Sequence, residues 1–217
     1  SIERGGLFTE LRQAHGSATL TEVTRQRVDW QRQAARDLAE GRFDAAVAAF
    51  DHHDAVTWRT DQDASRAALV EQWKADTAKD PKASRFVFAY TNEEVDQLNT
   101  ALRQVRRERG ELGGPDAQLA TKHGSAAFAV GDRVQFTDTA KKLGIYNGTV
   151  GTLIGLDART GEVAVRLDAP AGKAGRIVSW SAADGFEGFR HGYVGTIYKG
   201  QGKTLDHTYL LHTQHWR

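Results

Sequence analysis

Several residue types that build special sites are missing from this sequence. It has no cysteine among its 217 residues, which excludes disulfide bonds and thiolate metal sites. It has no run of about 18 apolar residues, so no segment is expected to cross a membrane. Lys and Arg number 29 against 28 Asp and Glu, which leaves a formal net charge of only +1. Any nucleic-acid surface must therefore be a local patch rather than a property of the whole chain.

Methionine is absent as well, including at position 1. We therefore interpret the sequence, which starts at Ser1 and stops at Trp216-Arg217, as a segment of a longer protein. What is present is ordinary: 40% hydrophobic and 26% charged residues are typical of a globular protein with a sizeable core. We expect such a protein in the cytoplasm, without a bound metal.

The most informative stretch runs from His191 to Thr204 and reads HGYVGTIYKGQGKT. Its closely spaced glycines allow positive φ and a close approach to a ligand. The cations and hydroxyls between them are groups that bind phosphate. A P-loop would need glycine where Ile197 stands, so Gly202-Lys203-Thr204 is not expected to be the end of one.

The same stretch resembles motif V of the first helicase superfamily, in its RecD-like branch, with the pattern G-Y-A-x-T-[IV]-H-K-[ST]-Q-G-x-[ST]. The matching residues are Gly192, Tyr193, Thr196, Ile197, Lys199, Gln201, Gly202 and Thr204. Three residues differ from the pattern: Val194 replaces alanine, Tyr198 replaces histidine and Gly200 replaces serine or threonine. The resemblance implies DNA contacts for Thr196, Tyr198, Lys199 and Thr204. It implies that Gln201 and Gly202 couple ATP to the DNA grip.

A second landmark lies near the start of the chain. Residues 18–23 predict a strand, and Arg25-Gln26 follows it. This order resembles helicase motif IV, which implies that Arg25 reaches the γ-phosphate of ATP and that Gln26 assists the coupling. An isolated Arg-Gln pair also fits a solvated basic turn, and this alternative stays open.

A third landmark is the junction Tyr90-Thr91-Asn92. It follows the apolar strand predicted over residues 84–90 and begins a helix with the capping-box residues Thr91 and Glu94. Strand-to-helix turns at the carboxyl edge of a parallel sheet are common ligand sites. The run also resembles the helicase segment that leads single-stranded DNA across the lobe, which implies DNA contacts for Tyr90, Thr91 and Asn92. The outer face and end of the helix carry four arginines, most of which are interpreted as solvated: Arg103, Arg106, Arg107 and Arg109.

The rest of the sequence predicts mainly helices in its first half and short strands after about residue 126. Helices are predicted at 29–38, 43–50 and 63–78 and a strand at 55–59, and a Gly-rich linker at 111–125 follows the helix after Asn92. Short strands are then predicted at 129–136, entered through a Gly-Asp turn, and at 149–156, 162–167 and 176–180, with a hairpin turn at Asn147-Gly148. They suggest a small barrel at about 126–182, which resembles the SH3-like insertion of RecD-like helicases. A last strand is predicted at 206–212.

Together these landmarks resemble the helicase region of Ti-plasmid-type conjugative-transfer relaxases. The resemblance implies an α/β fold: a RecA-like lobe 2A at 1–125 and 183–217, without its own P-loop, interrupted by barrel 2B at 126–182. It implies a parent enzyme that uses ATP and Mg, with single-stranded DNA, the other helicase lobe and a relaxase domain as partners. The chain alone is expected to bind no cofactor and to be inactive. The alternative is an SH3-like adaptor that binds protein or RNA, which a separate C-terminal barrel would favour.

Overall fold

The computed structural model describes residues 17–22, 29–52, 56–59, 62–200 and 202–213. These form two compact units. The first, called the α/β unit, contains the described residues up to Leu98, together with Val194–Ile197 and those from Leu205 onward. The second, called the β-rich unit, contains Asn99–Tyr193 and the described residues of Tyr198–Thr204.

The α/β unit is built on a five-stranded sheet with the order β11-β3-β12-β1-β2. Its strands are β1 (Ser17–Glu22), β2 (Val56–Arg59), β3 (Arg85–Ala89), β11 (Val194–Gly195) and β12 (His207–Thr213). β3 is parallel to both β11 and β12, whereas β1 runs antiparallel to β12 and β2. The prediction that the strand near 206–212 joins the sheet of residues 84–90 is confirmed, with Leu210 opposite Phe88. The sheet is mixed rather than purely parallel because of β1.

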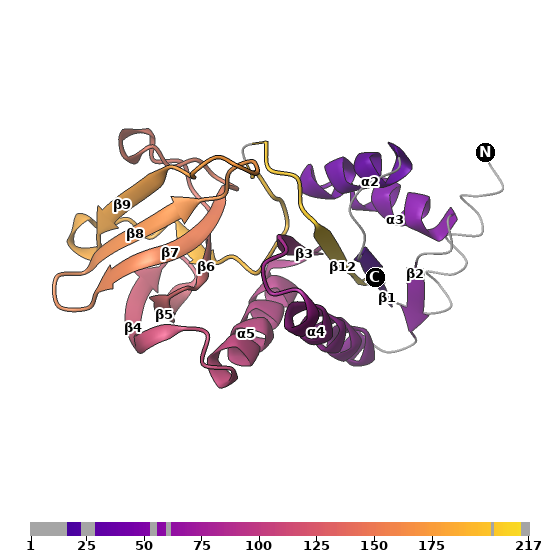
Figure 1. Cartoon of the computed structure of the whole chain (residues 1–217), viewed down its shortest axis with the longest axis horizontal. Helices are drawn as coiled ribbons and strands as arrows, with labels where there is room; N and C mark the ends of the chain where they lie inside the picture. Colours follow the sequence, from indigo (N-terminus) through magenta and orange to yellow (C-terminus); the bar gives the residue numbers. More distant parts are fainter. Residues whose placement is uncertain (1–16, 23–28, 53–55, 60–61, 201, 214–217) are drawn as a thin grey trace. The chain divides into compact units, whose positions relative to one another are not determined.

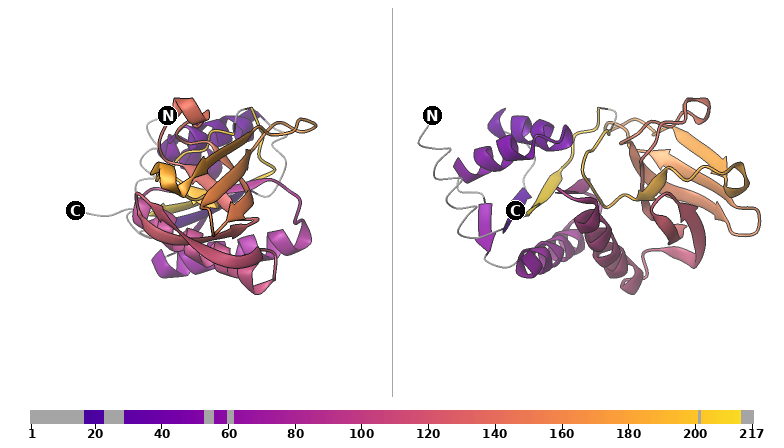
Figure 2. Two further views of the ribbon diagram at one scale, coloured as in Figure 1. Left: turned by 90° about the vertical axis from the view of Figure 1, so that its left-hand side faces the viewer. Right: turned by 180° about the vertical axis from the view of Figure 1, so that it is seen from behind.

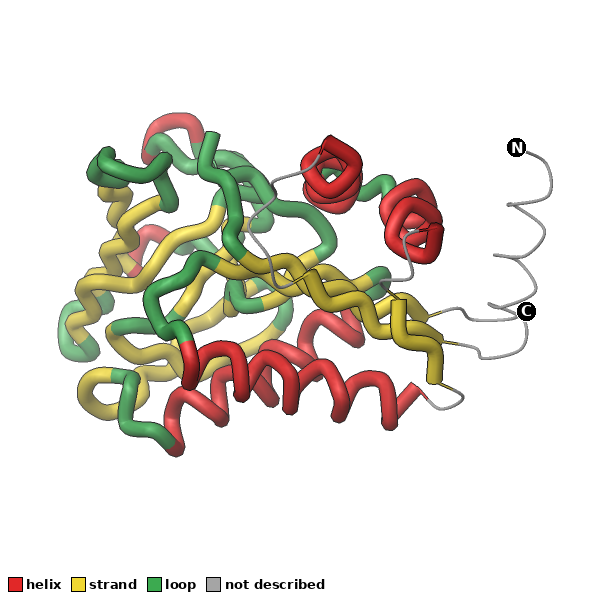
Figure 3. Tube along the Cα trace, turned by 45° about the vertical axis from the view of Figure 1, so that its right-hand side comes forward, coloured by secondary structure: helices red, strands yellow, loops and turns green. Residues whose placement is uncertain are grey.

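Helices cover both faces of this sheet. They are α2 (Asp29–Ala39), α3 (Phe43–His52), α4 (Gln62–Lys79) and the first residues of α5 (Asn92–Glu108). α2 and α3 lie on one face and α4 on the other (Figures 1 and 3). β3 is apolar along its whole length after Arg85, as expected for a strand covered on both sides, and Phe86 and Phe88 are fully buried. Pro81 follows α4, where it cannot continue a helix.

The β-rich unit begins within α5 and contains an antiparallel five-stranded sheet with the order β10-β6-β7-β8-β9. These strands, seen from two further sides in Figure 2, are β6 (Arg133–Phe136), β7 (Val150–Asp157), β8 (Glu162–Leu167), β9 (Ile177–Ser181) and β10 (Phe189–His191). Alternate residues of β8 point into the core, so Val163, Val165 and Leu167 are buried. The aromatic rings of Phe136 and Trp180 meet edge to face there, with centroids 5.5 Å apart.

The prediction of a linker at 111–125 is wrong. These residues belong to a hairpin of β4 (Gly113–Thr121) and β5 (Gly124–Val130). Most of β4 is exposed, so it has few apolar positions and looks like a linker in sequence. Its buried Leu119 packs into the core of the β-rich unit, and the Thr121 hydroxyl closes the turn by donating to the Gly124 carbonyl at 2.6 Å.

Two turns also differ in detail from the sequence prediction. The strand predicted over 129–136 is divided, because Gly131 has φ +97° and separates β5 from β6. Asn147-Gly148 does not make a two-residue hairpin, since β6 ends at Phe136 and a short 3-10 helix, η1 (Lys141–Leu143), intervenes before β7. Gly148 does have positive φ, +89°, as the Asn-Gly pair predicts.

Candidate nucleic-acid interface

Two of the predicted DNA-contacting segments meet at one edge of the sheet in the α/β unit. β3 and β11 are parallel, with Val194 opposite Val87 and Gly195 opposite Phe88. Because both strands end at the same edge, Thr196, which follows β11, lies beside the end of β3, where Tyr90 follows. Thr196 and Tyr90 are both half-buried, so each exposes part of its side chain at this edge.

Tyr90 is held in place by α3. Its hydroxyl donates a hydrogen bond to Asp44 Oδ1 at 2.9 Å. Its ring meets that of Phe43 edge to face, with centroids 4.6 Å apart. These contacts fix the ring before any ligand arrives, which lowers the entropic cost of a contact with it.

Thr91 begins α5 as predicted. Its hydroxyl oxygen accepts from the Glu94 N–H at 3.2 Å, as an N-cap residue does. Only this half of the predicted capping box forms. The carboxylate of Glu94 is instead buried against α4, where it accepts from Arg66 at 2.9 and 3.0 Å and from Gln62 at 2.6 Å. The hydrogen bond to Glu94 raises the pKa of Arg66, and this pair fixes the start of α5.

Asn92 is the first residue of α5 and is exposed. The first turn of a helix offers backbone N–H groups to an anion, but Glu93 places an exposed carboxylate next to Asn92. A phosphate would be repelled there, so the Asn92 amide is better suited to a base or a sugar.

The motif at 191–204 is divided between the two units: Thr196 belongs to the α/β unit and Lys199 to the β-rich unit. The Lys199 N–H donates to the Gly148 carbonyl at 3.0 Å, which ties this segment to the loop before β7. The side chains of Lys199 and Thr204 are exposed. Both are therefore accessible to a phosphate from solvent.

Tyr198 is only 6% exposed, and its hydroxyl donates to Asp168 Oδ2 at 2.9 Å. The same carboxylate accepts from Arg133 at 2.6 and 2.8 Å. Burial alone would raise the pKa of Asp168, but the guanidinium of Arg133 lowers it. Burial next to Asp168 raises the pKa of Tyr198. The structure thus argues against the predicted DNA contact of Tyr198, because stacking on a base requires an exposed ring face.

Gly200 lies directly against the ring of Tyr198. A Cβ atom at this position would be 2.4 Å from both Cε1 and the hydroxyl oxygen of Tyr198. The buried, hydrogen-bonded ring cannot move aside easily. The glycine that replaces the usual serine or threonine is therefore explained by the tyrosine that replaces the usual histidine.

Of the predicted coupling residues, the structure places Gly202. It is exposed and has φ +88°, a conformation that favours glycine, and it lies close to Pro170. Arg25, Gln26 and Gln201 lie outside the described residues.

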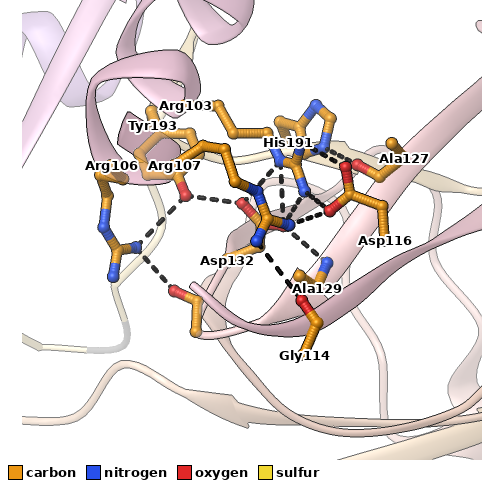
Figure 4. A network of polar contacts seen from close by, with 11 residues as sticks. Arg103, Arg106, Arg107, Gly114, Asp116, Ala127, Ala129, Asp132, His191 and Tyr193 are labelled. Atoms are coloured by element: carbon orange, nitrogen blue, oxygen red, sulfur yellow. Dashed lines mark hydrogen bonds and ion pairs between the residues drawn. The ribbon is translucent and has the colours of Figure 1, made fainter. Parts of the chain in front are cut away.

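The interpretation of the helix-end arginines as solvated is wrong for Arg103. Its side chain is 12% exposed and bridges Asp132, which is fully buried, and Asp116 (Figure 4). Asp132 also accepts from the Tyr193 hydroxyl at 2.7 Å and from the Ala129 N–H at 2.8 Å. Burial next to Asp132 raises the pKa of Tyr193. This network, which no sequence pattern predicted, fixes the second half of α5 inside the β-rich unit.

Arg106 and Arg107 extend the same network. Arg106 donates to the Gly131 carbonyl at 2.6 Å and to the Tyr193 hydroxyl at 3.2 Å, and Arg107 pairs with Asp116. Neighbouring His191 contacts the Ala127 carbonyl through Nε2 at 2.7 Å. These arginines have structural partners, so they do not form a free cationic surface. Across the described part of the chain, no cluster of three or more His, Asp or Glu is placed to hold a metal ion, and no helix is long and apolar enough to span a membrane.

The chain is similar in sequence to one protein family and to several known proteins. A family model described as AAA domain matches residues 1–61. Conjugal transfer protein TraA of Rhizobium radiobacter is 28% identical over 211 residues, which cover 97% of this chain and 18% of that protein. TraA of Agrobacterium fabrum is also 28% identical, over 210 residues with the same coverage. The chain is homologous to conjugal transfer protein TraA. The predicted relationship to conjugative-transfer proteins is therefore confirmed, and the chain spans 18% of the length of these TraA relatives.

Solved helicase structures give a weaker likeness. Unliganded Pif1 from Bacteroides sp. is 18% identical, with a TM-score of 0.32, and the match covers 46% of this chain and 31% of that chain. A structure of two coordinating Pif1 helicases at forked dsDNA is 17% identical, with a TM-score of 0.35, and covers 60% of this chain and 32% of that chain.

Proposed function

We propose that this chain is part of the second motor lobe of an ATP-dependent DNA helicase that acts on single-stranded DNA in conjugative transfer. In this proposal the α/β unit is the RecA-like lobe 2A, and the β-rich unit contains the SH3-like insertion 2B. The observation that carries it is the return of the chain to one sheet: β11 and β12 flank β3 after the excursion through the β-rich unit. An insertion of this kind fits a helicase lobe better than an adaptor with a separate C-terminal barrel.

DNA contacts are proposed at two places. Tyr90, Thr91, Asn92 and Thr196 gather at the carboxyl edge of the α/β unit's sheet, where strand-to-helix turns bind ligands. In the β-rich unit the contacts come from Lys199 and Thr204, which are exposed. Tyr198 is left out of this set, because its ring is buried.

In this proposal the part of the chain that the structure describes has no nucleotide site of its own. The Lys203 N–H, which a P-loop would turn toward a phosphate, donates to the Gly200 carbonyl at 3.1 Å. We therefore propose that ATP and Mg bind elsewhere in the parent protein, and that this chain alone hydrolyses no ATP. The roles proposed for Arg25, at the γ-phosphate, and for Gln26, Gln201 and Gly202, in coupling, rest on the resemblance to helicase motifs. The proposed further partners are the other helicase lobe and a relaxase domain.

The test uses the parent protein with Arg25→Ala. Removal of an arginine that stabilises the transferring γ-phosphate reduces kcat by roughly 10³–10⁵-fold. DNA-stimulated ATP hydrolysis should fall on that scale, while Arg27→Ala, two positions further on, should leave most of the activity. Equal effects of the two substitutions would show that Arg25 has no special role at the nucleotide.

A further inference from the structure

Three segments of the β-rich unit contain cations but no acidic residue. They are residues 139–149, 169–181 and 198–204, and they are here called the basic segments. Their cations are Lys141, Lys142, Lys173, Arg176, Lys199 and Lys203. All of these are exposed except Lys203, which is half-buried. In a chain with a net charge of only +1, such a set is a strong local bias.

The fold brings the basic segments together. Arg176 donates to the Gly144 carbonyl at 2.6 Å, which joins the second segment to the first. The Lys199 N–H donates to the Gly148 carbonyl at 3.0 Å, which joins the third to the first. Gly202 lies close to Pro170, which joins the third to the second. The positive charges therefore belong to one region of the β-rich unit.

The acids that directly precede the first two of these segments are paired with other cations. Asp138, just before the first segment, pairs with Lys122. Asp168, just before the second, forms its bidentate pair with Arg133. Their charges therefore offset little of the positive potential of the basic segments.

The first basic segment also presents an aromatic ring. Tyr146 is 45% exposed, next to Ile145, which is fully buried. The loop is fixed by reciprocal backbone hydrogen bonds between Ala140 and Ile145, at 2.9 and 3.1 Å. The Tyr146 carbonyl accepts from the Thr149 hydroxyl at 2.7 Å. A single exposed aromatic residue is common on protein surfaces, but this one lies on a fixed loop that also carries two lysines.

We propose that the basic segments bind single-stranded DNA, with Tyr146 as the platform on which a base stacks. The inference rests on the proposed function and adds to it a stacking residue and a set of phosphate contacts on the β-rich unit. Lys141 and Lys142, on the same fixed loop as Tyr146, contact the phosphates next to the stacked base. Tyr146 thus has the base-stacking role that was predicted for Tyr198, whose ring is buried.

The pairing of cations with an aromatic ring favours a single strand over other anions. A duplex keeps its bases stacked on one another and offers no free face to Tyr146. An acidic protein would use the lysines but would gain little from the ring. A polynucleotide single strand uses both, because base–aromatic stacking and phosphate contacts are its two main sources of affinity.

The test is a fluorescence-anisotropy titration of the 217-residue chain with a short labelled oligothymidine at several salt concentrations. Lys141→Ala combined with Lys142→Ala should flatten the log–log salt slope by about 0.7 for each phosphate that the removed lysines neutralise. Lys79→Ala combined with Lys82→Ala, on exposed lysines of the α/β unit, is the matched control and should leave the slope unchanged. Tyr146→Ala should weaken binding on the order of tenfold at every salt concentration, and Tyr146→Leu likewise, whereas Tyr146→Phe should preserve it.

The outcomes separate this inference from the proposed function. If the unaltered chain binds DNA and Lys199→Ala weakens binding, but the Lys141, Lys142 and Tyr146 variants match the unaltered chain, this inference is wrong and the proposed function stands. If the lysine variants bind more weakly but Tyr146→Ala does not, and polyglutamate competes as well as DNA, the basic segments bind acidic polymers in general and the inference is also wrong. No binding at low salt would overturn both.

Discussion

The hydroxyl of Tyr198 donates a 2.9 Å hydrogen bond to the carboxylate of Asp168, which Arg133 also holds. This buried cluster fixes the segment that carries Lys199 within the β-rich unit. The cluster also explains why residue 200 is glycine, since a Cβ atom at this position would overlap the ring of Tyr198. Tyr198 and Gly200, which both differ from the helicase pattern, thus belong to one structural feature.

The coupling of these two positions can be measured directly. Gly200→Ser should lower the free energy of unfolding by about 1–3 kcal/mol, because the new Cβ overlaps a ring that cannot move aside. In a Tyr198→His background the same substitution should cost much less. Urea unfolding of the two single variants and the double variant gives the coupling energy. An equal cost of Gly200→Ser in both backgrounds would contradict the explanation.

The arginine network predicts a large difference between two aspartates that bind the same guanidinium. Asp132 is fully buried beneath Arg103, whereas the side chain of Asp116 is 35% exposed. Asp132→Asn leaves Arg103 without its buried counter-charge and should cost about 3–5 kcal/mol. Asp116→Asn should cost less than about 1 kcal/mol. The measurement is urea unfolding of both variants, and similar costs would mean that burial does not set the strength of this pair.

His191 predicts a pH dependence of stability. Burial lowers the pKa of His191 from its ordinary value of 6.5, with Phe128 against its ring. Below that value the unfolded chain binds a proton that the folded chain resists, so the free energy of unfolding should fall as the pH drops through about 6.5 and continue to fall until the folded pKa is reached. Denaturant unfolding from about pH 7.5 to 5.5 should show this fall, reduced in His191→Gln. Exposed His123 is the control: His123→Gln should leave the fall in place, and no change in His191→Gln would refute the assignment.

Sequence reasoning succeeded where one local pattern decides the structure. The continuous apolar run of β3, the N-cap at Thr91 and the short strands of the β-rich unit all follow from periodicity and turn residues. It failed where the partner lies far away in the chain. The local pattern around Arg103 gives no sign of its burial, because Asp132 becomes its partner only after the chain has turned through β4 and β5. The burial of Tyr198 depends in the same way on Asp168, which no local spacing indicates.

The motif near Lys199 is proposed to contact single-stranded DNA, and the salt dependence of binding tests this contact most directly. In anisotropy titrations of the chain with a short oligonucleotide, Lys199→Ala should remove about one phosphate contact and flatten the log–log slope by about 0.7. Lys82→Ala, at an exposed position of the α/β unit, should leave the slope unchanged. Superimposable curves for Lys199→Ala and the unaltered chain at every salt concentration would contradict the account.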